Sequence, residues 1–542
     1  MTHSTTEKKL NTKNIIIVGG GTAGWMTANI LAYSLRDIDI SITLIESPDV
    51  GIIGVGEGST PALRNFFDLL KIEESDWMPA CNATYKTGIR FNGWSTIKGY
   101  ESYFHAFPSS LDIHTQKSFF YNAQLRATGI DLPANPSDFY ISAKISEQHK
   151  SPLANQNFPF EVDYAYHFDS NLLGKYLKKV AVNQGVKHIT GHVNDIDLAS
   201  NHDIQSIILK NGKKIKGDLF VDCTGFKGLL INKMPDIEFV SYSDELHNDS
   251  AIAISTPLSR NKSDEQSGNQ LGNQLGNKIA AQTESTALKH GWAWKIPLTN
   301  RYGNGYVYSA KHVSKAEAEK EFKAYLKLTS NEINTDDQET PHENNIGIKK
   351  AGSENNEKIR HLSFKLGRNN KHWQNNCLAV GLSQGFIEPL EATALLLIQQ
   401  TVGKFVDAYQ SGDFTNKNQL HFNEQINKEF DGIKDYIVLH YTLNSRNDTP
   451  YWQENRAHIK NMAPRLNILI QGWQKGLDIS KLVHKLGLHE HYPIPSWYSI
   501  LAGYGFFPYS LQTPSINHVT EGFEKSQDFI ERCSLNFPDY FI

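Results

Sequence analysis

The segment Gly19–Gly24 (GGGTAG) constrains the fold more than any other part of the sequence, because its glycines interrupt two regular patterns. Asn14–Val18 before it is an apolar run typical of a buried strand, and from Thr22 onward the apolar residues follow helical spacing. Apolar residues then alternate over residues 38–44 and end at Glu46, which is typical of a second strand. The pattern predicts a βαβ unit and hence a parallel sheet.

The glycines of this segment have separate tasks in a dinucleotide site. Gly19 permits the tight turn, Gly21 lets the backbone approach a pyrophosphate, and Gly24 lets the helix pack against the strand. Free N–H groups at the helix N-terminus face the phosphates, and Glu46 is positioned to bind a ribose hydroxyl. An ordinary glycine turn is the alternative, but a strand, a helix and an acid in register favour a dinucleotide, either FAD or NAD. The predicted contacts are Gly19, Gly21, Thr22, Ala23, Gly24 and Glu46.

The composition is that of a soluble globular protein with several lobes. The chain has 542 residues, of which 39% are hydrophobic, 11% aromatic and 21% charged, which is too aromatic for disorder and too polar for a membrane bundle. Lys and Arg number 54 against 58 Asp and Glu, a net charge of -4. Without a positive field to attract phosphates, we expect no nucleic-acid partner.

The cysteines and the N-terminus predict a cytoplasmic protein. Cys81, Cys223, Cys377 and Cys533 lie far apart and form neither a CxxC motif nor a disulfide framework, which favours a reducing compartment. The first residues are polar, without the apolar core of a signal peptide. We find no run of the roughly 18 to 20 apolar residues that a membrane span needs. No metal site and no membrane association are predicted.

The middle of the chain is predicted to be rich in strands and interrupted by polar segments. Residues 186–225 contain short apolar runs and the hairpin signal Asn211-Gly212, so we expect a β-meander there. Residues 260–280 repeat glycine and amides, and residues 329–358 are rich in Asn, Glu, Asp and Thr. Both polar segments are expected to be solvated insertions or long loops.

The last part of the chain has helical periodicity. It begins near Glu391, where a long apolar-periodic segment runs to Gly412. We therefore expect two domains. The first, residues 1–390, is a dinucleotide-binding domain with sheet segments and the insertions, and the second, residues 391–542, is a mostly helical lobe.

Two further motifs stand out. Gly54–Pro61 (GVGEGSTP) is too rich in glycine for the interior of an element and is expected to wrap a ligand, a plain surface loop being the alternative. In Gly291–Pro297 (GWAWKIP), Trp292 and Trp294 fall on one face of a strand, where two indoles form a wall. The alternative is a core sheet without further function.

Together these motifs resemble a known family. GGGTAGW (19–25), GVGEGSTP (54–61), CNATYK (81–86), GWAWKIP (291–297) and GFIEPLEAT (385–393) occur in the same order as in the flavin-dependent tryptophan halogenases, and the resemblance spans most of the chain. The WxWxIP signature separates these halogenases from flavin monooxygenases of the same fold. The resemblance implies an α/β (α+β) protein with an FAD-binding Rossmann-like domain of the class A flavin monooxygenase type, a β-sheet part and a mostly helical C-terminal substrate lobe.

The resemblance also implies the cofactor and its partner. FAD rather than NAD is the bound dinucleotide, and a separate flavin reductase supplies it reduced. Reduced flavin, dioxygen and halide give hypohalous acid, which travels inside the protein to an aromatic substrate. The residues that match flavin-binding positions are Gly56, Glu57, Leu382 and Leu395, with Val193 beside the adenine. A homodimer is compatible with the resemblance.

Two catalytic residues are implied. Lys86 matches the family lysine that holds the oxidant, by hydrogen bonding or as a haloamine, and in a dry site its pKa is expected to fall. Glu391 matches the carboxylate that orients the hypohalous acid and accepts the proton of the cationic ring. Taken alone, Lys86 would be a surface residue and Glu391 a helix N-terminal acid. Trp292 and Trp294 match the wall between substrate and flavin.

The halide site departs from the family pattern. Thr393 and Ala394 match positions whose backbone N–H groups cradle the halide at a helix N-terminus. Where tryptophan-specific members have Ser-Thr-Gly, this chain has Ala392-Thr393-Ala394. Alanine keeps the N–H group but restricts φ, so we expect a halide pocket of different shape. Chloride and bromide both stay open.

The substrate site departs further. His105, Phe107 and Trp452 match the aromatic residues that sandwich the indole. Where the family has two tyrosines and then a glutamate, this chain has His440-Tyr441 and Asn447, so a free α-ammonium group loses its ionic partner. We therefore expect an indole-like or other electron-rich aromatic substrate rather than free tryptophan. A flavin-dependent aromatic hydroxylase and a non-catalytic flavin-binding protein are the alternatives.

Overall fold

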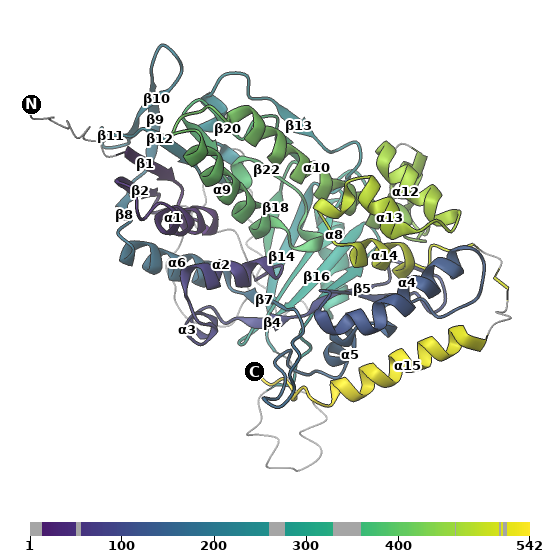
Figure 1. Ribbon diagram of the computed structural model, residues 1–542. Helices are drawn as coiled ribbons and strands as arrows, with labels where there is room; N and C mark the ends of the chain where they lie inside the picture. Colours follow the sequence, from purple (N-terminus) through teal and green to yellow (C-terminus); the bar gives the residue numbers. More distant parts are fainter. Residues whose placement is uncertain are drawn as a thin grey trace, which may run out of the picture.

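The computed structural model describes residues 13–49, 56–258, 277–328, 359–460, 462–508, 511–512 and 517–542 (Figure 1). Three predicted segments therefore lie wholly or largely outside the described residues: the start of the second glycine motif, most of 260–280, and all of 329–358. No described helix combines the length and hydropathy needed to cross a membrane.

The predicted βαβ unit is confirmed. β1 (Lys13–Val18) pairs in parallel with β2 (Ile40–Glu46), and α1 (Thr22–Ser34) connects them. The sheet has the order β20-β21-β12-β1-β2-β8, all parallel except β20. The other strands are β8 (Lys187–Thr190), β12 (Leu219–Asp222), β20 (Trp373–Gln374) and β21 (Cys377–Ala379).

Both faces of this sheet are buried, which explains the continuous apolar run of β1. Ile15 and Ile17 face the main core with α1, whereas Ile16 and Val18 face a second core made with a β-meander. α6 (Ser170–Asn183) and α9 (Ala394–Ser411) pack against α1. The alternation is that of a parallel strand covered on both sides.

The predicted meander is confirmed in its centre and wrong at its ends. β9 (Val193–Leu198), β10 (Ile204–Leu209) and β11 (Lys214–Lys216) form an antiparallel sheet. The turn before β11 contains Gly212 with φ +81°, as the Asn-Gly signal predicts. β8 and β12 at the ends instead join the parallel sheet, because their register is set by β2 and β1 rather than by the hairpin.

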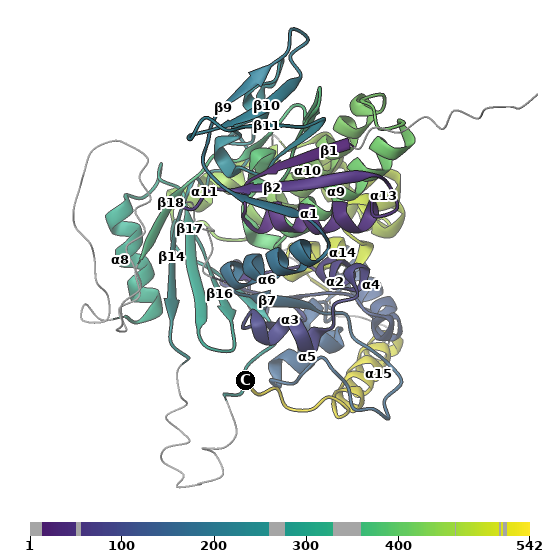
Figure 2. The same ribbon diagram turned by 90° about the vertical axis from the view of Figure 1, so that its left-hand side faces the viewer.

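A larger sheet stands beside the dinucleotide domain, with the order β18-β14-β17-β16-β15-β5-β6. α8 (Lys315–Leu326) covers its outer face (Figure 2), where it packs on Ala293, while Trp292 and Trp294 belong to the main core on the opposite face. The strands are β5 (Gly88–Asn92), β6 (Ser102–Ala106), β14 (Ser250–Thr256), β15 (Thr283–Ala287), β16 (Gly291–Pro297), β17 (Tyr302–Tyr308) and β18 (Arg360–Ser363).

Two small sheets bring loop segments to the centre. One has the order β3-β7-β4, with β3 (Glu57–Gly58), β7 (Ala165–Phe168) and β4 (Thr84–Lys86). The other has the order β13-β19-β22, with β13 (Phe239–Ser241), β19 (Gly367–Asn369) and β22 (Gly385–Phe386). The first sheet therefore joins the second glycine motif to the segment that carries Lys86.

The predicted helical character of the C-terminal part is confirmed. After α9 follow α10 (Gln419–Leu443), α11 (Pro450–Ala457), α12 (Pro464–Gln474), α13 (Ile479–Lys485), α14 (Ile494–Gly503) and α15 (Asn517–Ser534). α14 packs on β6 and α10, and α15 lies along α4 (Ile113–Ala127) and α5 (Ile141–Glu147) (Figure 1). α2 (Ala62–Leu70) and α3 (Glu74–Ala80) lie beneath the parallel sheet in Figure 2. The boundary at residue 390 stays a prediction.

Candidate active site

The first glycine loop has the shape of a pyrophosphate cradle. Gly19 has φ +115°, and a Cβ on Gly24 would lie 1.8 Å from the Gly19 carbonyl oxygen, so the turn and the helix pack too closely for side chains. Gly21, the N-cap of α1, has open space where its Cβ would be, and no side chain caps the helix. The buried Thr22 Oγ1 has no hydrogen-bond partner among the described residues. An open helix N-terminus with an unsatisfied hydroxyl fits a bound dinucleotide.

The other predicted cofactor residues surround this loop. Glu46 ends β2, and its Oε2 lies 2.8 Å from Lys178 Nζ and 2.9 Å from His188 Nε2. The Glu46 carbonyl accepts a hydrogen bond from Gly191, which brings the half-buried Val193 to the same strand ends. Leu382 lies on a short turn, Gly381–Ser383, that packs against Ala23 of α1, and Leu395 is buried on α9.

Lys86 is fully buried at the end of β4. Its Nζ donates to the Ser59 carbonyl at 2.9 Å and lies 5.3 Å from the centre of the Phe107 ring. Burial lowers the pKa of Lys86 to about 7, although the nearby charge of Glu391 opposes that fall. At neutral pH a large fraction of this amine is therefore uncharged.

The second glycine motif makes room for Lys86. The missing Cβ of Gly58 would lie 3.4 Å from Lys86 Nζ, and β3 pairs with β7 beside β4. Gly56 has φ +131°. Burial raises the pKa of the neighbouring Glu57 to about 7. The motif thus wraps the lysine, a contact that the glycine spacing did not indicate.

Glu391 is buried between two histidines. His105 Nδ1 lies 3.1 Å and His440 Nε2 2.9 Å from the same atom, Glu391 Oε1. Burial alone would raise the pKa of Glu391, but the two histidines lower it to about 2. The carboxylate is therefore ionised at any working pH. No ion pair joins it to Lys86 in the described part of the chain, although Glu391 raises the pKa of that lysine.

The tryptophan pair on β16 lies side by side as its spacing predicts. The ring centres of Trp292 and Trp294 are 6.1 Å apart, and Trp292 is buried. Trp292 Nε1 donates to Glu388 Oε2 at 2.9 Å, and the same oxygen accepts 2.8 Å hydrogen bonds from Asn248 Nδ2 and the Tyr441 hydroxyl. Burial raises the pKa of Glu388 while these donors oppose that rise.

The predicted halide segment begins α9. Thr393 is the buried N-cap residue and Ala394 the exposed first helical residue. The expectation of a halide pocket of different shape stays a prediction, and Ala394 itself is an ordinary helical residue. The left-handed residue is Ala392, with φ +56°.

The predicted substrate residues come from separate elements. The Phe107 N–H donates to the Thr87 carbonyl, next to Lys86, and His105 lies on the neighbouring β6. Trp452 is buried on α11, where it donates to the Leu288 carbonyl at 2.8 Å and contacts the edge of Trp94. A stacking role for His105 stays a prediction; its described side-chain contacts include Glu391 and Tyr436.

Sequence reasoning missed several residues of this centre. His440, Glu388, Asn248 and Ser59 contact the predicted residues directly. Glu388 is flanked by the apolar residues Phe386, Ile387 and Leu390. An acid in such a segment indicates a buried carboxylate that is hydrogen-bonded or functional, because charged side chains are rarely buried without partners. Ser59 lies in the GVGEGSTP motif but was not singled out, and Asn248 carries no comparable signal.

A family model described as tryptophan halogenase matches residues 14–520, which is nearly the whole chain. The chain belongs to the tryptophan halogenase family.

Relatives and solved structures agree with this assignment. The halogenase is 33% identical over 527 residues to 7-chloro-L-tryptophan 6-halogenase KtzR of Kutzneria sp. (strain 744), covering 92% of this chain and 91% of that protein. Tryptophan 6-halogenase SttH of Streptomyces toxytricini superposes with a TM-score of 0.77 at 30% identity, covering 97% and 98% of the two chains. BrvH, a flavin-dependent halogenase from Brevundimonas sp. BAL3, gives 0.76 at 28%, covering 98% of each. The predicted FAD-binding Rossmann-like fold and flavin-dependent halogenase class are confirmed.

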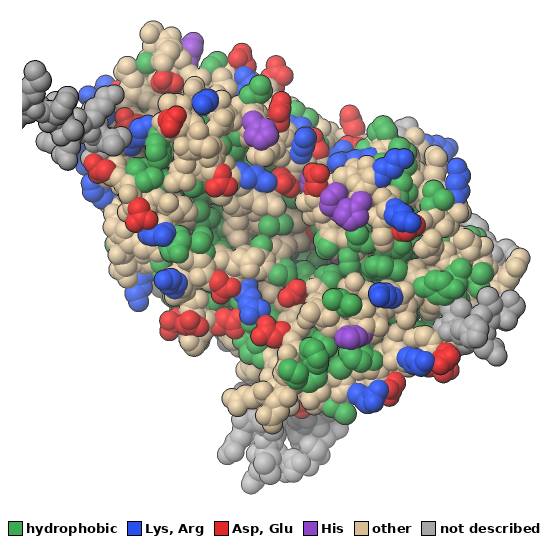
Figure 3. Space-filling model, in the orientation of Figure 1, with side chains coloured by type: hydrophobic (Ala, Val, Ile, Leu, Met, Phe, Trp, Pro, Cys, Tyr) green, Lys and Arg blue, Asp and Glu red, His purple; other side chains and the backbone are tan. Residues whose placement is uncertain are grey.

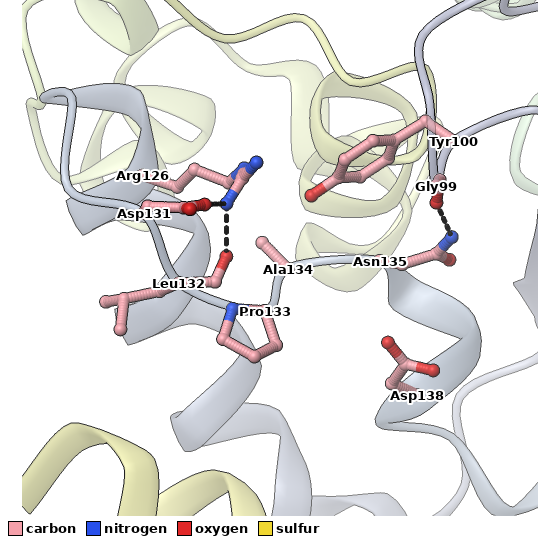
Figure 4. A pocket seen from close by; sticks show the side chains of 9 residues that line it. All are labelled: Gly99, Tyr100, Arg126, Asp131, Leu132, Pro133, Ala134, Asn135 and Asp138. Carbon is pink, nitrogen blue, oxygen red and sulfur yellow. Dashed lines mark hydrogen bonds and ion pairs between the residues drawn. The ribbon is translucent and has the colours of Figure 1, made fainter. Parts of the chain in front are cut away.

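The surface of the halogenase carries both signs of charge. Figure 3 shows Lys and Arg interspersed with Asp and Glu, and a hollow at the middle of this face where apolar side chains gather. A separate cavity of about 370 Å³ lies near β6 (Figure 4). Arg126 in it donates to the Leu132 carbonyl at 2.7 Å and pairs with Asp131. The residues that line this cavity are Gly99, Tyr100, Arg126, Asp131, Leu132, Pro133, Ala134, Asn135 and Asp138, so it lies outside the catalytic centre.

Proposed function

We propose that Lys86 and Glu391 are the catalytic pair of this halogenase, acting on an indole-like or other electron-rich arene. Bound FAD, supplied reduced by a separate flavin reductase, provides hypohalous acid from dioxygen and halide. The single observation that carries the proposal is that the pKa values of two buried groups, Lys86 and Glu391, are both lowered, which makes the lysine partly neutral and the glutamate ionised. Burial lowers the pKa of Lys86 to about 7, while two histidines hold Glu391 ionised.

These protonation states suit electrophilic substitution. The neutral amine of Lys86 has a lone pair that takes the halogen from hypohalous acid, and an amine proton passes to the departing hydroxide, which leaves as water. The halogen then bonds to the ring carbon as the N–halogen bond breaks, Glu391 accepts the ring proton, and its transfer to the amine nitrogen restores Lys86. Phe107, 5.3 Å from the Lys86 amine, supports placing the arene there, and Trp452 is proposed as the opposite wall.

Trp292 and Trp294 are proposed to separate the arene from the flavin. The cofactor residues are the glycine loop, Glu46 and the neighbouring set named above, and the N–H groups of Thr393 and Ala394 are proposed to hold the halide. The halide itself, chloride or bromide, is left to experiment. The homodimer and the cytoplasmic location stay predictions.

An arene without an amino-acid group is favoured over free tryptophan. His440 and Tyr441 are both engaged by buried carboxylates, Glu391 and Glu388, and Asn447 is exposed and uncharged. A substrate ammonium group would therefore lack a carboxylate partner. Such a loss corresponds to about 2–3 kcal/mol, or about 30- to 150-fold in kcat/KM between matched indoles.

The test is halide-dependent turnover. Purified protein, FAD, a flavin reductase, NADH and indole are incubated with bromide or chloride, and products are read by mass spectrometry for the halogen isotope pattern. Monohalogenated indole is expected, at a higher kcat/KM than free tryptophan gives. Oxygenated indole formed without regard to halide would show a hydroxylase, and bound FAD without any product would show a non-catalytic flavin protein.

A variant isolates the role of the lysine. Lys86→Ala should abolish halogenation and leave FAD affinity, measured by flavin fluorescence, unchanged. Lys295, a half-buried lysine on β16 that lies 3.8 Å from Glu284, provides the matched control, since Lys295→Ala should leave both properties in place. A fully active Lys86→Ala protein would refute the catalytic role.

A further inference from the structure

Both histidines contact the same oxygen of Glu391, Oε1, and neither contacts Oε2. His105 and His440 approach Oε1 from different elements, β6 and α10. Among the described residues, Glu391 Oε2 has no hydrogen-bond partner. The carboxylate is therefore anchored through one oxygen, and its second oxygen has unused acceptor capacity inside a buried centre.

The His440 ring is held by a polar contact and a stacking contact of its own. Its Nδ1 lies 2.6 Å from the Tyr504 hydroxyl, and its ring stacks on Phe91 with centres 4.7 Å apart. His440 Nε2 lies 2.9 Å from Glu391 Oε1, an ion-pair distance without hydrogen-bond alignment. Because an ionised carboxylate can only accept, this contact is favourable when Nε2 carries a proton, and Nδ1 of the neutral ring then accepts from the Tyr504 hydroxyl. The Tyr504 hydroxyl is compatible with this tautomer, because it can donate to Nδ1. Burial lowers the pKa of His440, in keeping with a neutral ring.

We propose that His440 is a positioning residue: with His105 it holds Glu391 through Oε1 and leaves Oε2 to receive the ring proton. This inference rests on the proposed base role of Glu391. It assigns to His440 the role of keeping that carboxylate ionised and oriented. Without His440, burial of Glu391 is opposed by one donor fewer, so the pKa of Glu391 rises.

Other titratable groups face Glu391 and enter the interpretation of any pH profile. Lys86 titrates near pH 7. The facing tyrosines have pKa values well above the usual value because of burial, so they stay neutral; they are Tyr103, Tyr436, Tyr492 and Tyr504. His105 remains as the second donor. Wild type and a His440 variant share all of these except the removed ring and its contact with Tyr504, so a difference between them reports on His440.

The experiment compares FAD-loaded wild type with His440→Leu and His440→Gln. Leucine removes the donor, whereas the glutamine amide can donate to Glu391 and accept from Tyr504 without titrating. Infrared difference spectra between pH 5 and pH 8 report the C=O stretch of a protonated carboxylic acid, and His440→Leu/Glu391→Gln identifies the band. Single-turnover bromination of indole is followed over the same pH range.

The expected result is a protonated Glu391 band at low pH in His440→Leu that wild type and His440→Gln lack. If the variant pKa lies one unit above the assay pH, about one-tenth of the carboxylate remains and bromination falls about tenfold there, with the loss shrinking as pH rises. His440→Phe, which keeps an aromatic ring against Phe91 and removes both ring nitrogens, gives the same test where His440→Leu does not fold. An ionised Glu391 and an unchanged pH profile in His440→Leu would overturn the proposal. A band that behaves as expected in a protein that does not halogenate would support the positioning role and overturn the proposed function.

Discussion

The indole N–H of Trp292 donates to Glu388 Oε2 at 2.9 Å, so the wall residue of β16 is tied to the motif that also carries Glu391. Glu388 is fully buried and three residues before Glu391, and it also binds Tyr441 of α10. One carboxylate therefore joins β16, the turn that carries Glu391, and α10. A mutation of Glu388 should therefore affect the stability of all three of these segments.

Glu388→Ala should destabilise the protein more than Glu388→Gln. Alanine leaves the N–H of Trp292 and the hydroxyl of Tyr441 without their acceptor, at about 1–3 kcal/mol for each buried donor, whereas the amide of Asn248 still donates to Tyr441. Glutamine keeps one acceptor oxygen and should cost about half as much. Urea unfolding followed by tryptophan fluorescence measures both variants, and equal losses would show that the donors find other partners.

The rate of halogenation should rise as pH increases through about 7 and then level off. Burial lowers the pKa of Lys86 to about 7, and the proposed capture of halogen uses the neutral amine, whose fraction grows above that pH. Single-turnover rates between pH 5.5 and 9, at constant ionic strength and with the reduced cofactor premixed, measure this rise of the rate with pH. A rate that falls above pH 7 would instead indicate that the ammonium form holds the oxidant by hydrogen bonding.

The parts of this protein that follow from local sequence could be predicted, and the contacts across the fold could not. The glycine loop, both strands of the βαβ unit and the paired tryptophans each depend on the spacing of neighbours. Lys86 and Glu391 were singled out by their motifs, yet their surroundings come from distant segments. Packing, rather than periodicity, brings Ser59 to Lys86 across 27 positions of sequence and His440 to Glu391 across a turn and two helices.

In the predicted halide segment, the backbone φ angle decides which alanine is expected to be strained. Sequence placed the unusual alanine at 394, whereas the backbone places the left-handed residue at 392. Ala392→Gly should therefore stabilise the protein by about 0.5–1 kcal/mol, because glycine adopts that conformation without a Cβ penalty. Ala394→Gly should do the opposite by up to about 1 kcal/mol, since it loosens the first turn of α9. Thermal unfolding of both variants checks the pair, and a destabilised Ala392→Gly would contradict it.

The glycine loop allows cofactor binding to be separated from folding. A Cβ on Gly21 would meet nothing within 4 Å, and its φ of -76° suits any residue, so Gly21→Ala should leave the melting temperature of the FAD-free protein unchanged. The same methyl would occupy the space where the pyrophosphate is proposed to lie, so the Kd for FAD should rise at least about tenfold, or 1.4 kcal/mol.

Gly24→Ala is the control for the opposite case. Its Cβ would lie 1.8 Å from the Gly19 carbonyl oxygen, so the strand and helix must separate and the melting temperature should fall even without FAD. FAD affinity is measured by flavin fluorescence titration and stability by calorimetry on the same samples. A Gly21→Ala protein that binds FAD as tightly as wild type would place the pyrophosphate elsewhere, because a methyl group at that position cannot coexist with a phosphate held against the helix N-terminus.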